Sequence, residues 1–166
     1  MSQSPGTSAK ERVMGEDDIF QPPDHALYPR YTGILTFMRV PYVEDPSGLD
    51  IAMVGVPFDS VVTNRPGARR GPRGLRDQSS LIRRVHHVTH TNPFELCKIA
   101  DVGDTPGNPV NVAKCLDLIT EFYRPIAEAG VTPLSVGGDH LITLPIFRAI
   151  AKDGPVGMVH FDAHTD

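Results

Sequence analysis

The sequence predicts an α/β fold in which a mostly parallel sheet carries helices on both faces. Short apolar runs that do not alternate with polar residues recur at 51–56, 97–102, 132–136 and 156–161, as in strands buried on both faces. Segments between them carry apolar residues at three- or four-residue steps, which is the period of an amphipathic helix. Strands that alternate with helices in this way imply parallel pairing in one sheet.

The first strand is "IAMVGV", and the Gly/Pro/Arg-rich loop "PFDSVVTNRPGARRGP" follows it. Pro72 suits the first turn of a helix. We therefore expect a helix to begin there, with Leu75, Ile82 and Val85 on one face.

The second strand, "CKIADV" at 97–102, leads into a Gly/Pro/Asn turn. From Pro109 the apolar residues recur at helical spacing as far as Ile126. Pro125 is expected to kink or shorten this helix, and Gly130 to end it.

The last part of the chain repeats the pattern. A strand at 132–136 runs into "GGDH", a helix is expected over about 144–152, and a strand, "VGMVHF" at 156–161, completes the order. Residues 1–25 are rich in Ser, Gly, Pro and charge, so we expect a mobile arm there and one domain over 26–166.

Composition excludes several classes of function. The 166 residues are 40% hydrophobic, as in a globular domain, and carry a net charge of -4 with no basic stripe. We expect no nucleic-acid partner, and no membrane partner because no apolar run approaches bilayer-spanning length. Only two cysteines occur, a count that fits the reducing cytoplasm better than a disulfide scaffold.

Metal-binding residue types gather where two predicted strands end. His140 closes "SVGGDH", and Asp162, His164 and Asp166 alternate after the last strand. Residues two apart in a strand are separated by roughly 6 to 7 Å, so one ion would require this segment to curl. Two ions relieve the problem, because Asp162 can bridge them with His140 on one and His164 on the other.

Carboxylate and imidazole ligands without thiolate fit Mn²⁺ and also admit nickel, zinc, cobalt or iron. Such a pair of ions can hold a water, lower its pKa and direct the resulting hydroxide at an electrophilic carbon. The residues therefore predict hydrolysis.

The stretches "GGDH", "HFDAHTD" and "GVPFDSVVTNRPGARRGPRGLR" together resemble the ureohydrolase family of arginases and agmatinases. The resemblance runs from about Tyr31 to Asp166, and "TFMRVP" and "TNRPGAR" resemble its agmatinase branch, which includes hydrolases of guanidino acids. It implies an arginase-like three-layer α/β/α fold, two manganese ions, and cleavage of a guanidino group into urea and an amine.

Carried over by position, the resemblance implies that His140 and Asp166 bind one metal and His164 the other, with Asp162 as the bridge. Asp139 would orient His140 or its loop. The family's remaining carboxylate ligands and its general acid are expected beyond residue 166, so the catalytic acid is unassigned. We expect the chain to be the N-terminal portion of a longer enzyme, and to be inactive alone.

Other polar residues have competing interpretations. His160 precedes the ligands in the strand, and a hydrogen-bonded histidine behind them is favoured over a direct ligand. Asn64, Arg65 and Arg69 would either line the site entrance, where they could meet a substrate carboxylate, or be solvated and ion-paired.

The favoured function is hydrolysis of agmatine or a guanidino acid such as guanidinobutyrate by a metal-bridging hydroxide, with Ni²⁺ as an alternative to Mn²⁺. A second hypothesis is a non-catalytic or regulatory subunit, because Leu141 stands where the family usually has a small polar residue and because the family's downstream carboxylate motif is not in these 166 residues. A third is a hydrolase of guanidine or small alkylguanidines. A homo-oligomer, trimer or hexamer, is expected, with Tyr31 to Pro41 as a candidate contact.

Overall fold

The computed structural model describes residues 19–164. In this range three parallel strands form one sheet in the order β2-β1-β3, with β1 at Ile51–Gly55, β2 at Ile99–Asp104 and β3 at Thr132–Val136. β1 pairs with both neighbours and is the most buried of the three. The first three predicted strands are confirmed, the second beginning and ending two residues later than expected.

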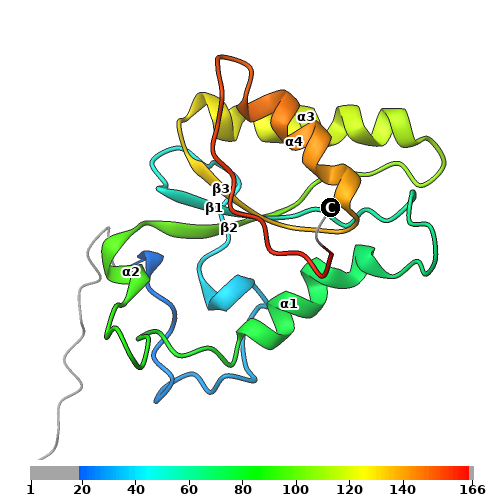
Figure 1. The fold of residues 1–166 in the computed structure, drawn as a ribbon. Coiled ribbons are helices and arrows are strands. Elements are labelled where there is room, and N and C mark those ends of the chain that lie inside the picture. The colour runs from blue at the N-terminus through cyan, green and yellow to red at the C-terminus, as the bar shows by residue number, and fades with distance from the viewer. Residues whose placement is uncertain (1–18, 165–166) are drawn as a thin grey trace, which may run out of the picture.

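Helices cover both faces of the sheet, which gives the predicted three layers (Figure 1). α3 (Val112–Glu128) and α4 (Thr143–Ile150) pack against each other on one face, and α1 (Gly71–Ser79) lies on the other. The remaining helices are short: η2 (Phe37–Arg39), η3 (Ala68–Arg70), α2 (Pro93–Leu96) and η4 (His140–Ile142). The α/β/α arrangement is therefore confirmed for the described residues.

α3 begins and ends at signals that the sequence carries. The Asn111 side chain accepts a hydrogen bond from the backbone N–H of Lys114 at 2.9 Å and so caps the helix. Gly130, just past its end, has a φ of 69°, which favours glycine. The expectation that Pro125 shortens the helix is wrong: the helix continues to Glu128, because a proline in the last turn removes only one hydrogen bond. The buried face consists of Cys115, Leu116, Ile119, Thr120, Tyr123 and Ile126.

α1 has the predicted beginning, with Pro72 in its first turn. The predicted apolar face is wrong. The helix ends at Ser79, so it is too short to carry Ile82 and Val85, and both residues and Leu75 are about half exposed, at 45 to 46%. The residue that ties this helix to the sheet is instead charged.

That residue is Arg76. Its guanidinium donates to both carboxylate oxygens of Asp101, at 2.7 and 2.9 Å, and to Asp104 at 2.6 Å. The Asp101 side chain is 1% exposed and also accepts the backbone N–H groups of Phe37 and Gly103. The guanidinium also lies over the Phe37 ring, 4.2 Å from its centroid. One carboxylate of β2 thus joins α1 and the N-terminal segment to the sheet.

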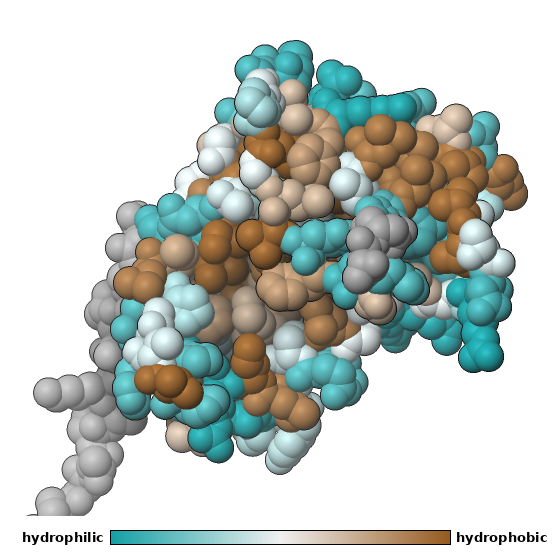
Figure 2. Space-filling view, in the orientation of Figure 1, coloured by the Kyte–Doolittle hydropathy of each residue, from teal (hydrophilic) through white to brown (hydrophobic). Residues whose placement is uncertain are grey.

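The predicted strand at 156–161 is wrong. These residues have no regular structure and are exposed, with Val159 and Phe161 at 85 and 93%. A strand exists only through hydrogen bonds to a neighbour, and the described residues supply none here. Figure 2 shows hydrophobic residues left uncovered on this face of the molecule. Leu134 of β3 and Met158 are among those exposed.

Residues 1–18 of the predicted 1–25 arm lie outside the described residues. The remainder contacts the domain, because Gln21 donates a side-chain hydrogen bond to the carbonyl oxygen of Phe94. The boundary at residue 25 stays a prediction. Within residues 19–164, no helix combines the length and the apolar character needed to cross a bilayer.

Replacing Asp101 with Ala should lower the free energy of unfolding by about 3 to 5 kcal/mol, because it leaves the largely buried Arg76 without its main partner. Asp104→Asn, which removes a half-exposed partner of the same arginine, should cost about 1 kcal/mol or less. Denaturant unfolding of both variants measures the two losses. Equal losses would contradict the assignment of Asp101 as the joining carboxylate.

Candidate metal centre

The loop at 137–140, which follows β3, is held by close backbone contacts on two sides. Gly138 has a φ of 79°, and a Cβ there would lie 2.4 Å from the carbonyl oxygen of Phe58. A Cβ on Gly71, the first residue of α1, would lie 2.5 Å from the carbonyl oxygen of Gly137. Glycine permits both approaches because it has no side chain. The loop is therefore clamped between the segment after β1 and the beginning of α1.

Asp139 fastens the same loop with three hydrogen bonds. Its backbone N–H donates to the carbonyl oxygen of Phe58 at 2.8 Å. Its carboxylate accepts the backbone N–H of Leu141 at 3.0 Å, which caps η4, and that of Val61 at 3.3 Å. Burial raises the pKa of this carboxyl above its usual value. Asp139 thus fixes the turn that precedes His140, and its role in orienting a metal ligand stays a prediction.

Two imidazoles, His160 and His164, flank the carboxylate of Asp162, and a third, His140, lies beside His160. The ring centroids of His140 and His160 are 5.0 Å apart. Nε2 of His160 lies 3.5 Å from one Asp162 oxygen, and Nδ1 of His164 lies 3.3 Å from the other. The His164 backbone N–H lowers the pKa of Asp162, and the charges of the three histidines add to the effect. Four of the predicted site residues therefore meet, while Asp166 lies outside the described residues.

The strand geometry expected for Asp162 and His164 is wrong. An oxygen of Asp162 accepts the backbone N–H of His164 at 2.9 Å, which is the bond of an Asx-turn. The turn curls the chain, so the two side chains approach each other as they would not in an extended strand. Residues two apart in this motif can bind the same ion only if the chain curls in this way.

The donor chemistry of this group fits a divalent first-row cation, because imidazole nitrogen and carboxylate oxygen are ligands that Mn²⁺, Ni²⁺ and Zn²⁺ all accept. The geometry is less complete. In the described part of the chain, no three His, Cys, Asp or Glu side chains are arranged to hold an ion. His160, His164 and Asp162 stand on the segment that pairs with no strand, so no strand pairing fixes the direction of their side chains.

The family comparison decides the identity of the fold. The model of the arginase family matches residues 49–166, which include the whole sheet and every candidate ligand. The chain belongs to the arginase family. Because the match covers "GGDH" and "HFDAHTD", the resemblance seen in these motifs is confirmed.

Individual members of the arginase family are similar over most of this chain. A guanidinopropionase from Pseudomonas aeruginosa is 54% identical over 150 residues, which are 90% of this chain and 47% of that protein. A mitochondrial guanidino acid hydrolase from Homo sapiens is 46% identical over 147 residues, 88% and 42% of the two chains. The solved proclavaminate amidino hydrolase from Streptomyces clavuligerus has a TM-score of 0.75 and 36% identity, with coverage of 82% and 46%. The chain spans about half the length of the curated relatives it matches.

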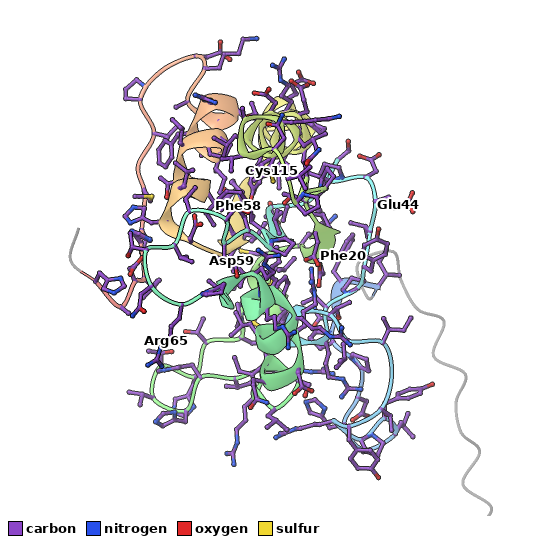
Figure 3. All side chains as sticks on the ribbon, turned by 90° about the vertical axis from the view of Figure 1, so that its right-hand side faces the viewer. Phe20, Glu44, Phe58, Asp59, Arg65 and Cys115 are labelled. Atoms are coloured by element: carbon purple, nitrogen blue, oxygen red, sulfur yellow. The ribbon has the colours of Figure 1, made fainter. Side chains whose placement is uncertain are left out.

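In this arginase-family chain, the loop after β1 is organised by Asp59, whose side chain is fully buried. Its carboxylate accepts the backbone N–H groups of Gly67 at 2.6 Å and Arg69 at 3.2 Å, and pairs with the Arg69 guanidinium. Asn64 and Arg65 are exposed. Figure 3 shows Arg65 on the same side of the molecule as the C-terminal segment. A substrate role for Asn64, Arg65 and Arg69 stays a prediction, and Arg69 is already engaged by Asp59.

Sequence reasoning missed Asp59. Its signal is a carboxylate directly after a buried strand, followed by a loop whose glycine and arginines supply donors. Asp59 and Arg69 are 10 residues apart in the sequence. No sequence periodicity predicts which arginine of the loop pairs with Asp59.

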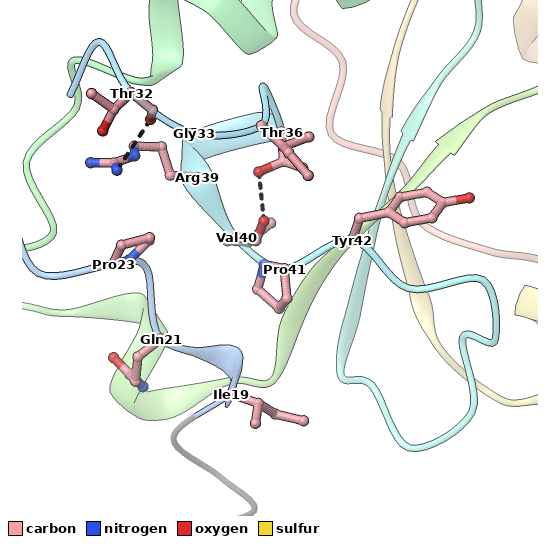
Figure 4. A pocket seen from close by; sticks show the side chains of 11 residues that line it. Ile19, Gln21, Pro23, Thr32, Gly33, Thr36, Arg39, Val40, Pro41 and Tyr42 are labelled. Atoms are coloured by element: carbon pink, nitrogen blue, oxygen red, sulfur yellow. Dashed lines mark hydrogen bonds between the residues drawn. The ribbon is translucent and has the colours of Figure 1, made fainter. Parts of the chain in front are cut away.

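The described cavities lie away from the candidate metal residues. One of about 310 Å³ is lined by the 19–23 and 32–42 segments (Figure 4). A second of about 190 Å³ lies beside Arg76 and Asp101. Neither is lined by His140, Asp162 or His164. His140, Asp162 and His164 are exposed in the described part of this arginase-family chain.

The hydrogen bonds from Arg69 lower the pKa of Asp59 to about 2. The pKa of an aspartate in an unfolded chain is about 3.9. The ion pair should therefore stabilise the fold fully above about pH 4, and this stabilisation should be lost as the pH falls toward about 2. Carbon NMR of the Asp59 carboxyl measures its titration directly. A midpoint near 4 would contradict the ion pair, and Arg69→Gln should move the midpoint upward.

Proposed function

We propose that the whole protein hydrolyses a linear guanidino compound, agmatine or a guanidino acid, to urea and an amine with the help of bound divalent cations. The observation that carries the proposal is that His160 and His164 flank the Asp162 carboxylate while His140 packs on the His160 ring, at one edge of an arginase-family sheet. Relatives named for guanidinopropionate, guanidinobutyrate and agmatine support the substrate class.

Asp162 would be shared between two cations, His140 and Asp166 would hold one, and His164 the other. Nδ1 of His164 is the ring nitrogen that faces Asp162, so it is the atom placed to join that carboxylate at a cation. When bound, such cations lower the pKa of water and supply hydroxide to attack the guanidinium carbon. Mn²⁺ is the proposed ion and Ni²⁺ the alternative, because both accept this set of ligands.

The protein's own residues have separate roles in this proposal. Asp139 holds the turn that presents His140. His160, whose Nε2 faces the second oxygen of Asp162 at 3.5 Å, would donate a hydrogen bond that directs this carboxylate toward the cations. The acid that protonates the departing amine is not among the residues assigned.

One of the two grounds for the alternative of a non-catalytic subunit is Leu141, the other being the carboxylate motif expected beyond residue 166. The structure gives this residue a packing role, because Leu141 is half-buried against the hydrophobic core and donates its N–H to Asp139. Because the Leu141 side chain packs against the core, it leaves the polarity beside the candidate metal-binding residues unchanged. The hydrolase is therefore the better supported of the two functions.

The setting of the enzyme is part of the proposal. Cys97 and Cys115 are free thiols, which suits a reducing compartment such as the cytoplasm. A small guanidino compound is the proposed partner, without nucleic acid or membrane, in a homo-oligomer that is a trimer or a hexamer. Tyr31, at 90% exposure, and Ile34, at 88%, leave apolar surface for such a contact.

Urea release by the whole protein, loaded with Mn²⁺ or Ni²⁺, should occur with agmatine, 4-guanidinobutyrate or 3-guanidinopropionate. His140→Ala and Asp162→Ala should each reduce the rate at least 100-fold, because each removes a ligand of the cations. His87→Ala, at an exposed turn, is the control and should keep the rate. No urea from any of these compounds, nor from guanidine and dimethylguanidine, with two cations bound would contradict the function. Urea from the last two alone would select the alkylguanidine alternative.

A further inference from the structure

Asp59 stands on one of the two segments that clamp the 137–140 loop and binds the other. On one side, the chain from Phe58 to Val61 is hydrogen-bonded to Asp139 through both its backbone and its carboxylate. On the other side, the chain from Gly67 leads through η3 to Gly71, which packs on the carbonyl oxygen of Gly137.

The Asp59 carboxylate connects these two sides. It belongs to the first segment, and its partners among the described residues, the N–H of Gly67 and the N–H and guanidinium of Arg69, belong to the second. Charge-assisted hydrogen bonds of this kind are about twice as strong as neutral ones and fix the planes of both groups. The two halves of the clamp are therefore connected through one carboxylate, by two backbone hydrogen bonds and one ion pair.

We propose that the Asp59–Arg69 ion pair positions His140 for metal binding, by holding Gly71 and Val61 on opposite sides of the loop that ends at His140. This inference rests on the proposed metal-dependent function. Residues that orient a metal ligand without binding the metal themselves typically change the metal affinity by a factor of about 10 to 100. We expect the ion pair to act on the cation at His140 and to leave the cation at His164 nearly unchanged.

Arg69 is the better residue to change, because its side chain is 51% exposed whereas that of Asp59 is fully buried. Arg69→Gln keeps a donor and much of the volume but removes the charge and the paired N–H groups. Asp104→Asn is the matched control, since it removes an arginine–carboxylate contact at the end of the neighbouring strand that has no hydrogen bond to the 137–140 loop.

The experiment is calorimetric titration of the whole protein with Mn²⁺, for wild type, Arg69→Gln, Asp104→Asn and His140→Ala, together with the thermal midpoint of each metal-free protein. Arg69→Gln should weaken one of two binding events about 10-fold or more, namely the event that His140→Ala abolishes. In a variant that combines Arg69→Gln with His140→Ala, the remaining binding event should match that of His140→Ala alone. Asp104→Asn should bind both ions as wild type does.

Each other outcome overturns the proposal. If Arg69→Gln binds both ions like wild type, the ion pair does not position His140. If it weakens both events to the same degree and lowers the thermal midpoint, the pair supports the fold in general. If wild type binds no Mn²⁺, the metal-dependent function itself fails, and the positioning role fails with it.

Discussion

The approach of the Gly137–Gly138 backbone to its neighbours is the constraint on which the candidate site depends. A side chain at Gly138 would collide with the carbonyl oxygen of Phe58, and one at Gly71 with that of Gly137. These contacts bring the ends of β1 and β3 and the beginning of α1 within van der Waals distance of one another. His140 follows directly, so its position depends on backbone packing at the carboxyl edge of the sheet, where parallel folds place their reacting groups.

Charged pairs hold the elements that surround this edge. Arg76 binds Asp101 and Asp104 at the end of β2, and Arg69 binds Asp59 after β1. Both are arginine–carboxylate pairs: Arg76 lies in the last turn of α1 and binds β2, and Arg69 lies in η3 and binds the loop after β1. Because Asp101 and Asp59 are buried, removing either partner would leave a charge without compensation. The arrangement makes the loop ends of the sheet rigid at the place where ligands must be presented in a fixed direction.

The sequence predicts those parts of the fold whose signals are local. The strands at 51–56 and 132–136, the helix around Ile119 and its end at Gly130 follow from hydrophobic period and turn chemistry. The strand at 156–161 was predicted by the same signal, but a strand requires a paired neighbour and the described residues give it none. The motifs also indicated which site residues would meet. They could not indicate the Asx-turn that curls Asp162 toward His164, or the Asp59–Arg69 pair, because these depend on irregular loop geometry.

The central claim is that Asp162 lies between two cations, with His140 at one and His164 at the other. The most direct measurement is anomalous diffraction at the manganese edge from crystals of the whole protein grown with Mn²⁺. The account predicts two peaks about 3.5 to 4 Å apart, with Asp162 in contact with both, His140 with one and His164 with the other. A single peak, or peaks bound by other side chains, would contradict it.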